Sequence, residues 1–293
     1  MLGRRDWDEN EESMTVVFFR DDDVGERDTP LENVVELLLE ESIPCSYQVV
    51  PRFLTGAGAT YMKKAQTERP GLVILNQHGL VHEQEINGKL RYSEFDGDRP
   101  YAEQRKAIES GRLILGEKLG ESFDGSVFTP PCHKYDANTL RALTAAGITT
   151  LSAGVKVGAM STAYYAVGSA LGRVSLLGKR VSYHGDLTPG GGLAEVSVCI
   201  DVDEDVDRQG EKIEKSYDDL VREFERCRSS LSTVGVMLHH GKCEGRRVDT
   251  LRAFVKMLKA DPTVELRTLN QIAADARAQA VALGGTTSVS HPS

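Results

Sequence analysis

The sequence lacks the features that mark membrane, secreted and nucleic-acid-binding proteins. No run approaches the roughly 20 apolar residues of a membrane-spanning helix, and residues 1–13 contain charged side chains without the apolar stretch of a secretory signal. The 35 Lys and Arg are outnumbered by 44 Asp and Glu, giving a formal net charge of −9. No local basic cluster offsets this excess, so we expect neither a membrane span nor nucleic acid as a partner.

Cysteine is also scarce. The five cysteines are Cys45, Cys132, Cys199, Cys227 and Cys243, and none forms a CxxC pair. Their odd number and wide separation favour neither a disulfide framework nor a thiolate zinc site. We therefore expect a cytoplasmic protein in a reducing compartment.

What remains is the composition of a globular chain. With 293 residues, 40% hydrophobic and 27% charged, it is long enough for one large α/β domain or two ordinary ones. No repeat or linker separates two cores. We expect one domain over residues 14–280, between a disordered acidic head at 1–13 and a disordered Gly/Ser/Thr-rich tail at 281–293.

Apolar patterning predicts strands that alternate with helices. The first half begins with a buried strand over 15–20, a helix over 29–41 and a strand over 45–50. Residues 83–100 are polar and without sustained periodicity, so we expect an insertion loop there. The alternation predicts parallel strands with right-handed crossovers, in an α/β sheet or barrel.

The second half continues the alternation after a less regular stretch. We expect a strand over 180–183, a flexible segment over 189–192 and a strand over 195–200. An acidic loop over 201–207 and a helix over 211–230 follow, and the last predicted helix lies near 269–280.

Reactive side chains collect at the ends of four predicted strands. The clusters are Asp21–Asp23, Asn76–His82, Thr129–His133 and His239–His240, which together include five of the seven histidines. In folds with parallel strands, the loops at the carboxyl ends converge on one face and form the active site. We therefore expect these four clusters to meet.

The aspartate triplet predicts a cation. A run of acidic residues is ordinarily a helix cap, but Asp21, Asp22 and Asp23 follow a buried strand directly. Their charges repel one another, and their partial burial is costly unless a cation neutralises them. A divalent metal at the strand end would remove that cost.

His78 and His82 are the natural further ligands. Residues four apart on one helical turn have Cβ atoms about 5 to 6 Å apart, so both imidazoles reach one ion. Such a pair alone is more often structural, but with an aspartate it completes an Asp-His-His set that leaves positions open for water and substrate. No Glu lies between the histidines as in HExxH, so a neighbouring aspartate is the expected general base.

His239 and His240 end an apolar strand, so only one of the two side chains can face the site. A buried structural histidine beside a solvated one is an equally good interpretation of the pair alone. The ordinary pKa of histidine suits either residue to protonate a leaving group.

In this order, the motifs resemble those of the polysaccharide deacetylase family, the NodB-homology domain of carbohydrate esterase family 4. The matching segments are Phe19–Val24 with its aspartates, His78–His82, the proline loop Phe128–Cys132, the helix and glycine at Asp136–Gly147, and Val236–His240. Arg20–Val24, His78–His82 and Glu94–Arg99 further resemble the WbmS-like branch. The resemblance implies a distorted, incomplete (β/α)7-type barrel of the glycoside hydrolase–deacetylase kind, with Zn²⁺ or another divalent metal.

The resemblance also implies roles for individual residues. Alignment on Val24 makes Asp22 the general base and Asp23 a metal ligand, whereas a shift by one residue gives Asp21 and Asp22. The other two ligands fall on His78 and His82. The general acid falls on His239 or His240.

The chain departs from the family at the third and fourth motifs. Thr129 stands where the family usually has an arginine that holds the base, so Arg20 or Arg99 would have to substitute. The nearest counterpart of the fourth motif is Tyr183–Asp186. We expect substrate contacts from six residues, namely Arg20, Tyr92, Arg99, Pro131, Cys132 and His133.

The insertion at 83–100, with Tyr92 and Phe95, is interpreted either as a cover that contacts sugar or as a mobile surface loop. The expected activity is hydrolysis of the acetamide of an N-acetylated sugar or surface-polysaccharide precursor by metal-activated water. The alternatives are a metal-dependent amidase on a non-sugar C–N bond and a non-catalytic carbohydrate-binding relative. The presence of both aspartates and both ligand histidines argues against the last.

Overall fold

The computed structural model describes residues 14–284, apart from 87, 97–98, 159–160, 162, 164–166, 168–174, 177–178, 181–184, 187–192 and 207–211. The head at 1–13, the segment 189–192, and Tyr183 and His184 of the expected fourth motif therefore lie outside the described residues. Among the helices that are described, none is long and apolar enough to cross a membrane.

The centre of the fold is a mostly parallel sheet in the order β10-β11-β7-β6-β3-β2-β1-β15-β12, with β16 paired to β1. Its strands are β1 (Thr15–Val24), β2 (Cys45–Val49), β3 (Val73–His78), β6 (Phe123–Thr129), β7 (Thr150–Leu151), β10 (Gly185–Asp186), β11 (Ala194–Glu195), β12 (Ile200–Asp201), β15 (Thr233–His239) and β16 (Val264–Leu266). The pair β10–β11 is antiparallel and the other pairs are parallel.

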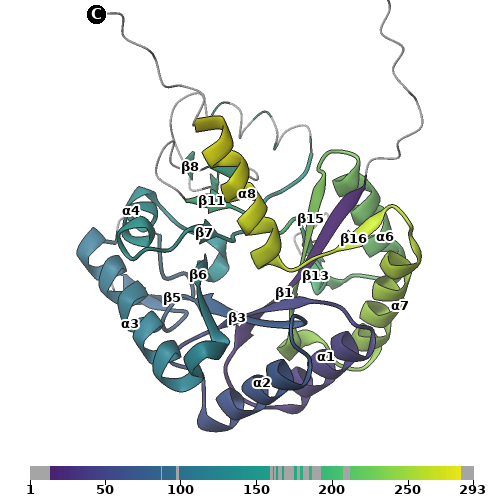
Figure 1. Cartoon of the computed structure of the whole chain (residues 1–293), viewed down its shortest axis with the longest axis horizontal. Coiled ribbons are helices and arrows are strands. Elements are labelled where there is room, and N and C mark those ends of the chain that lie inside the picture. The colour runs from purple at the N-terminus through teal and green to yellow at the C-terminus, as the bar shows by residue number, and fades with distance from the viewer. Residues whose placement is uncertain are drawn as a thin grey trace, which may run out of the picture.

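Helices surround the strands (Figure 1). They are α1 (Thr29–Glu40), α2 (Gly56–Glu68), α3 (Tyr101–Leu119), α4 (Ala137–Ala145), α6 (Tyr217–Arg228), α7 (Arg246–Ala260) and α8 (Leu269–Gly284). Three short 3₁₀ turns are described: η1 (Gly120–Ser122), η2 (Pro131–His133) and η3 (His240–Lys242). The small two-stranded sheets are β4 (Gln84–Ile86) with β5 (Lys89–Arg91), β8 (Ser175–Leu176) with β9 (Lys179–Arg180), and β13 (Glu204–Val206) with β14 (Lys212–Glu214).

One chain segment, residues 193–202, brings the two edges of the sheet together. Its beginning pairs with β7, where the Val196 amide donates to the Leu151 carbonyl at 2.9 Å, and its end pairs with β15, where the Cys199 amide donates to Gly235 at 2.8 Å. The expected strand over 195–200 is therefore split into the two short strands β11 and β12. The sheet curls into a distorted, incomplete (β/α) barrel, which confirms the predicted fold class.

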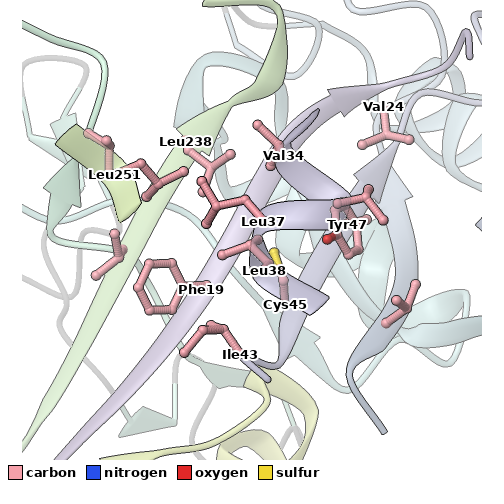
Figure 2. Close-up of a cluster of buried hydrophobic side chains, with 14 of the residues drawn as sticks. Phe19, Val24, Val34, Leu37, Leu38, Ile43, Cys45, Tyr47, Leu238 and Leu251 are labelled. Atoms are coloured by element: carbon pink, nitrogen blue, oxygen red, sulfur yellow. The ribbon is translucent and has the colours of Figure 1, made fainter. Parts of the chain in front are cut away.

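Apolar side chains fill both faces of the curled sheet. Outside it, Phe19, Cys45 and Tyr47 of the strands pack against Leu37 and Leu38 of α1 (Figure 2). Inside it, a cluster that contains Phe18, Val127, Val198 and Met237 packs against Leu269 and Ile272 of α8. Asn270 of α8 also bonds Asp124 at the start of β6. Because α8 covers the amino ends of the strands, the carboxyl ends are the open side.

The strand β1 is longer than the sequence predicted. It continues through all three aspartates to Val24, because Asp21 and Asp22 are buried against partners rather than solvated. Its register against β2 shifts between Asp21 and Val24, and Asp23 takes a φ of 67°. Because of this bulge, the Asp23 side chain does not follow the regular alternation of side-chain directions along the strand.

Other expected boundaries also differ. The insertion at 83–100 contains the hairpin β4–β5 and a buried turn rather than only a loop. Residues 212–214 form β14, and α6 begins at Tyr217 because Ser216 and Asp219 cap its start reciprocally. At the other end of the chain, α8 extends to Gly284.

Candidate active site

The four predicted clusters meet at the carboxyl ends of β1, β3, β6 and β15. Asp23, His78 and His82 place one ligand atom each within 4.8 Å of one another. The Nε2 atom of His78 lies 3.2 Å from Asp23 Oδ1, and that of His82 lies 3.0 Å from the same oxygen. The two histidines are not on a helical turn, as the spacing suggested, because His78 ends β3 and His82 lies in the next loop with a φ of 60°.

This group fits a divalent metal. The Nδ1 atom of His78 lies 3.0 Å from the carbonyl oxygen of Thr129. A carbonyl only accepts hydrogen bonds, so Nδ1 of His78 donates to Thr129 and Nε2 is turned toward Asp23. Two imidazoles and a carboxylate, with one imidazole held from behind, form a ligand set typical of zinc and related metals.

The protonation of the group follows from the same contacts. Burial by itself would raise the pKa of Asp23, but the hydrogen bonds and charges of His78 and His82 hold that pKa well below its usual range. Burial would likewise lower the pKa of His82, yet Asp23 raises it. Asp23 is therefore an anionic ligand over the whole useful pH range.

Asp22 is held by Arg20, two residues earlier on β1. The guanidinium Nε lies 2.8 Å from Asp22 Oδ1, and Nη2 donates to Oδ2 at 2.8 Å. Arg20 also donates to the Ser152 hydroxyl at 2.9 Å and to the Ala153 carbonyl at 2.9 Å, which fixes its direction. Burial would raise the pKa of Asp22, but Arg20 and His133 hold it well below its usual range.

The position of Arg20 explains the missing arginine of the third motif. Thr129, which stands at that position, uses its hydroxyl to donate to Gln48 at 2.8 Å and its carbonyl to hold His78. Arg20 reaches Asp22 from β1 instead. The second candidate, Arg99, donates to the Glu94 carbonyl at 3.0 Å and lies 3.6 Å from the Glu103 carboxylate, so it contacts the insertion and α3.

The η2 loop places His133 beside the same carboxylate. Its Nε2 atom lies 2.5 Å from Arg20 Nη2 and 3.5 Å from Asp22 Oδ2. The imidazole of His133 thus lies against both members of the Arg20–Asp22 pair. The φ angles of Cys132 and His133 are positive, at 53° and 57°. A Cβ added at Gly154 would lie 2.5 Å from His133 Nδ1. Gly154 thus leaves room for the imidazole.

The two late histidines face different partners. His239 pairs in register with Asp22, and its Nδ1 lies 2.7 Å from Asp203 Oδ2. His240 places Nδ1 3.0 Å from Asp21 Oδ2 and donates its backbone N–H to Asp21 at 2.9 Å. Neighbouring side chains on a strand point to opposite faces. The structure therefore brings His239, rather than His240, to the face that holds Asp22.

Asp203 changes the proton affinity of His239. Burial would lower the pKa of His239, but the hydrogen bond to Asp203 and the charge of Asp22 raise it to about 9. The sequence reasoning missed Asp203, whose only signal was its place in the acidic segment after β12. Asp201, Asp203 and His239 also place ligand atoms within 4.8 Å of one another, but the Asp203 oxygen is already bonded to the His239 imidazole and amide.

The remaining predicted contact residues lie around this centre or away from it. Pro131 lies close to the loop after β3, because a Cβ added at Gly79 would be 2.7 Å from Pro131 Cγ. The Cys132 side chain is exposed. Tyr92 is 68% exposed on the insertion. Phe95, expected to contact sugar, is instead fully buried and packs edge-on against Phe128 at 5.2 Å.

A cavity of about 420 Å³ borders the site. His133 and Met237 form the wall nearest Arg20, and Asp201, Lys156 and Arg226 contribute charged groups.

Comparison with known proteins identifies the fold. The sequence matches no family model and no curated protein. A putative polysaccharide deacetylase from Mycobacterium smegmatis is 14% identical, with a TM-score of 0.64 over 97% of this chain and 96% of that one. A family 4 acetyl xylan esterase from Clostridium thermocellum, solved with cobalt, is 11% identical with a TM-score of 0.53 over 89% and 91% of the two chains. Puue allantoinase is 13% identical, with a TM-score of 0.59 over 90% of each chain.

These likenesses extend over almost the whole length of the chain, and the site lies at the carboxyl ends of the strands where such barrels place their chemistry. The fold of this chain is therefore that of the polysaccharide deacetylases and family 4 carbohydrate esterases, as its sequence motifs predicted.

Proposed function

We propose that this protein is a metal-dependent hydrolase that removes the acetyl group from the nitrogen of an N-acetylated sugar or surface-polysaccharide precursor. The observation that supports this most is the arrangement of the site. A carboxylate held by a buried arginine, Asp22, lies between the Asp23–His78–His82 group and His239. A base, a metal-binding group and an acid are the parts that amide hydrolysis by water requires.

Asp23, His78 and His82 would hold Zn²⁺ or another divalent metal, which lowers the pKa of water and polarises a carbonyl when bound. Asp22 accepts the proton of the attacking water. The contacts with Arg20 and His133 keep Asp22 ionised at neutral pH, so it is ready to act as a base.

His239 donates a proton to the departing nitrogen. With its pKa raised to about 9, His239 is protonated at neutral pH, and Asp203 fixes the imidazole through Nδ1 so that Nε2 points away. The water oxygen forms a bond to the acetyl carbon, the C–N bond breaks, and the nitrogen takes the His239 proton. The products are acetate and a free amine.

The η2 loop supplies the donor that we assign to the oxyanion. The His133 N–H already donates to the Pro130 carbonyl at 2.9 Å, so the donor in this loop is the Cys132 N–H. Tyr92, exposed on the insertion, remains a proposed sugar contact.

A second candidate function is hydrolysis of a C–N bond in a molecule other than a sugar. It is supported by the likeness to an allantoinase, whose TM-score is close to that of the first deacetylase. The two candidates share the same site residues and differ in the molecule that fills the cavity.

Acetate release from a panel of N-acetylated sugars and nucleotide sugars, combined with metal analysis, tests the proposal. One metal per chain and acetate from at least one sugar are expected. Metal without acetate favours the non-sugar amidase, and neither favours a non-catalytic carbohydrate-binding relative.

The Asp22→Asn variant tests the base. It should retain metal, because Asp23, His78 and His82 are unchanged, and lose at least about 100-fold in turnover, the usual contribution of a general base. Asp218→Asn, on the exposed first turn of α6, is the matched control. A fully active Asp22→Asn protein would contradict the assignment.

A further inference from the structure

The insertion between β3 and α3 contains a buried segment that its polar sequence does not suggest. The hairpin strand β5 is exposed, but Ser93, Glu94 and Phe95 directly after it are buried, at 3%, 0% and 0% exposure. Phe95 packs against Phe128 of β6, and its carbonyl accepts from the Thr139 hydroxyl of α4 at 3.2 Å. The segment is therefore fixed to the core directly after Glu94.

The carboxylate of Glu94 binds the loop that presents His82. Its Oε2 atom accepts the backbone N–H groups of Leu80 at 2.8 Å, Val81 at 3.2 Å and His82 at 3.3 Å. Three consecutive N–H groups that converge on one oxygen form an anion-binding concavity, which here is filled from within the chain. Such a contact fixes the direction of all three peptide planes.

The surroundings of Glu94 are shaped for this contact. A Cβ at Gly79, whose φ is 59°, would overlap Glu94 Oε2 and lie 2.7 Å from Pro131 Cγ. Arg99 donates to the Glu94 carbonyl at 3.0 Å, with its guanidinium 3.8 Å from Oε1. Burial raises the pKa of Glu94, and the Leu80 and Val81 amides oppose that rise.

The last amide in this set belongs to His82 itself, whose imidazole lies 3.0 Å from Asp23 Oδ1. We propose that Glu94 is a positioning residue for the metal centre: it fixes the backbone of residues 80–82 so that His82 meets Asp23 and His78, and thereby sets the affinity for a divalent metal. The proposal rests on the proposed function, since it assigns the insertion to the support of the same site. Groups that hold ligands in place typically change metal affinity by 10- to 100-fold.

Zinc affinity of the whole protein, measured by competition with a chromophoric chelator, tests the proposal. Glu94→Met keeps the length of the side chain but removes the acceptor, and we expect zinc affinity to fall about 10- to 100-fold. Glu94→Gln, whose amide oxygen can accept the same N–H groups, should restore affinity to within a few-fold of wild type. Glu85→Ala, exposed on the same insertion, is the control and should leave affinity unchanged.

Hydrogen exchange of the metal-free proteins reports the contact itself. The amides of residues 80–82 should exchange faster in Glu94→Met than in wild type, and Glu94→Gln should restore their protection. Should Glu94→Met not fold, Glu94→Asp replaces it, because its carboxylate is one methylene too short to reach all three amides.

Equal zinc affinity in wild type and the Glu94 variants, or loss in Glu94→Gln equal to that in Glu94→Met, would overturn the positioning role alone. A wild-type protein that binds no zinc would overturn the proposed function together with it. The two failures are thus told apart by the wild-type titration.

Discussion

Arg20 and Asp22 are two buried charges that depend on each other. Both side chains are almost fully removed from solvent, and the guanidinium contacts both carboxylate oxygens. A buried ion pair adds little net stability compared with apolar residues, but loss of one partner leaves the other charge uncompensated. The pair therefore makes the position of the proposed base dependent on a residue of the same strand.

Arg20→Met should lower the free energy of unfolding by about 3–5 kcal/mol, because Asp22 is left buried without its partner. Arg20→Met combined with Asp22→Asn should recover much of that loss. Urea denaturation of the four proteins in the cycle measures both effects. Arg105→Met, which removes an exposed ion pair with Glu109, should cost less than about 1 kcal/mol. A similarly small loss in Arg20→Met would contradict the account.

The raised pKa of His239 predicts a pH dependence. The proposed acid must be protonated, so turnover should be retained at neutral pH and fall as the pH rises through about 9. Asp203→Asn removes the hydrogen bond and charge that raise this pKa, so the alkaline limb of the kcat profile should move to lower pH. Asp218→Asn should leave the limb in place, and an unmoved limb in Asp203→Asn would speak against His239 as the acid.

Sequence reasoning found the residues whose spacing forms a motif and missed those recruited by distant contacts. The Asp22–Asp23 run and the His78–His82 pair are local patterns that can be recognised without knowledge of the fold. Asp203 lies in an acidic stretch where nothing local separates it from solvated carboxylates, and the resemblance that includes Glu94–Arg99 gave Glu94 no role. Their roles arise only because the barrel brings residue 203 to residue 239 and the insertion folds back on residues 80–82.

At the scale of elements, helix α3 packs against the end of β3 and the loop that follows it, which leads to His82. Gln77 at the end of β3 donates to the Gly79 carbonyl at 2.9 Å and to the Ile108 carbonyl of α3 at 3.1 Å. The helix can approach this closely because Gly111 has no side chain. A Cβ there would overlap the Gln77 amide and lie 3.0 Å from the Gly79 carbonyl oxygen.

Alanine at two glycine positions of α3 should therefore change the free energy of unfolding in opposite directions. Gly111→Ala should lower the free energy of unfolding by about 1–3 kcal/mol through overpacking. Gly116→Ala, where a Cβ meets nothing within 4 Å, should raise it by up to about 1 kcal/mol through helix propensity. Chemical denaturation compares the two, and a stabilising Gly111→Ala would show that the helix does not pack as described.

The long elements were predictable and the short ones were not. Apolar periodicity indicated β1, α1 and β15, whose buried faces are continuous. The strands β11 and β12 have two residues each and exist because residues 193–202 pair first with one edge of the sheet and then with the other. No local pattern encodes such a change of partner. The continuation of β1 through three aspartates likewise depends on partners far along the chain.

At the scale of the whole molecule, the curled sheet brings together the proposed base, metal-binding residues and acid from three strands. Asp22 and Asp23 come from β1, His78 from β3 and His239 from β15, while α8 covers the opposite end of the barrel. The formal charge of −9 includes the two aspartates at this site. Under the proposed function part of the acidic excess belongs to the site, and a bound dication would cancel two units of it.

Acetate release before and after metal removal tests this account most directly. Protein treated with a chelator should lose release of acetate from its N-acetylated substrate, and about one equivalent of Zn²⁺ or another divalent metal should restore it. The same treatment of His78→Ala should restore nothing. Acetate release that persists at full rate in the metal-free protein, or that returns equally in His78→Ala, would contradict the account.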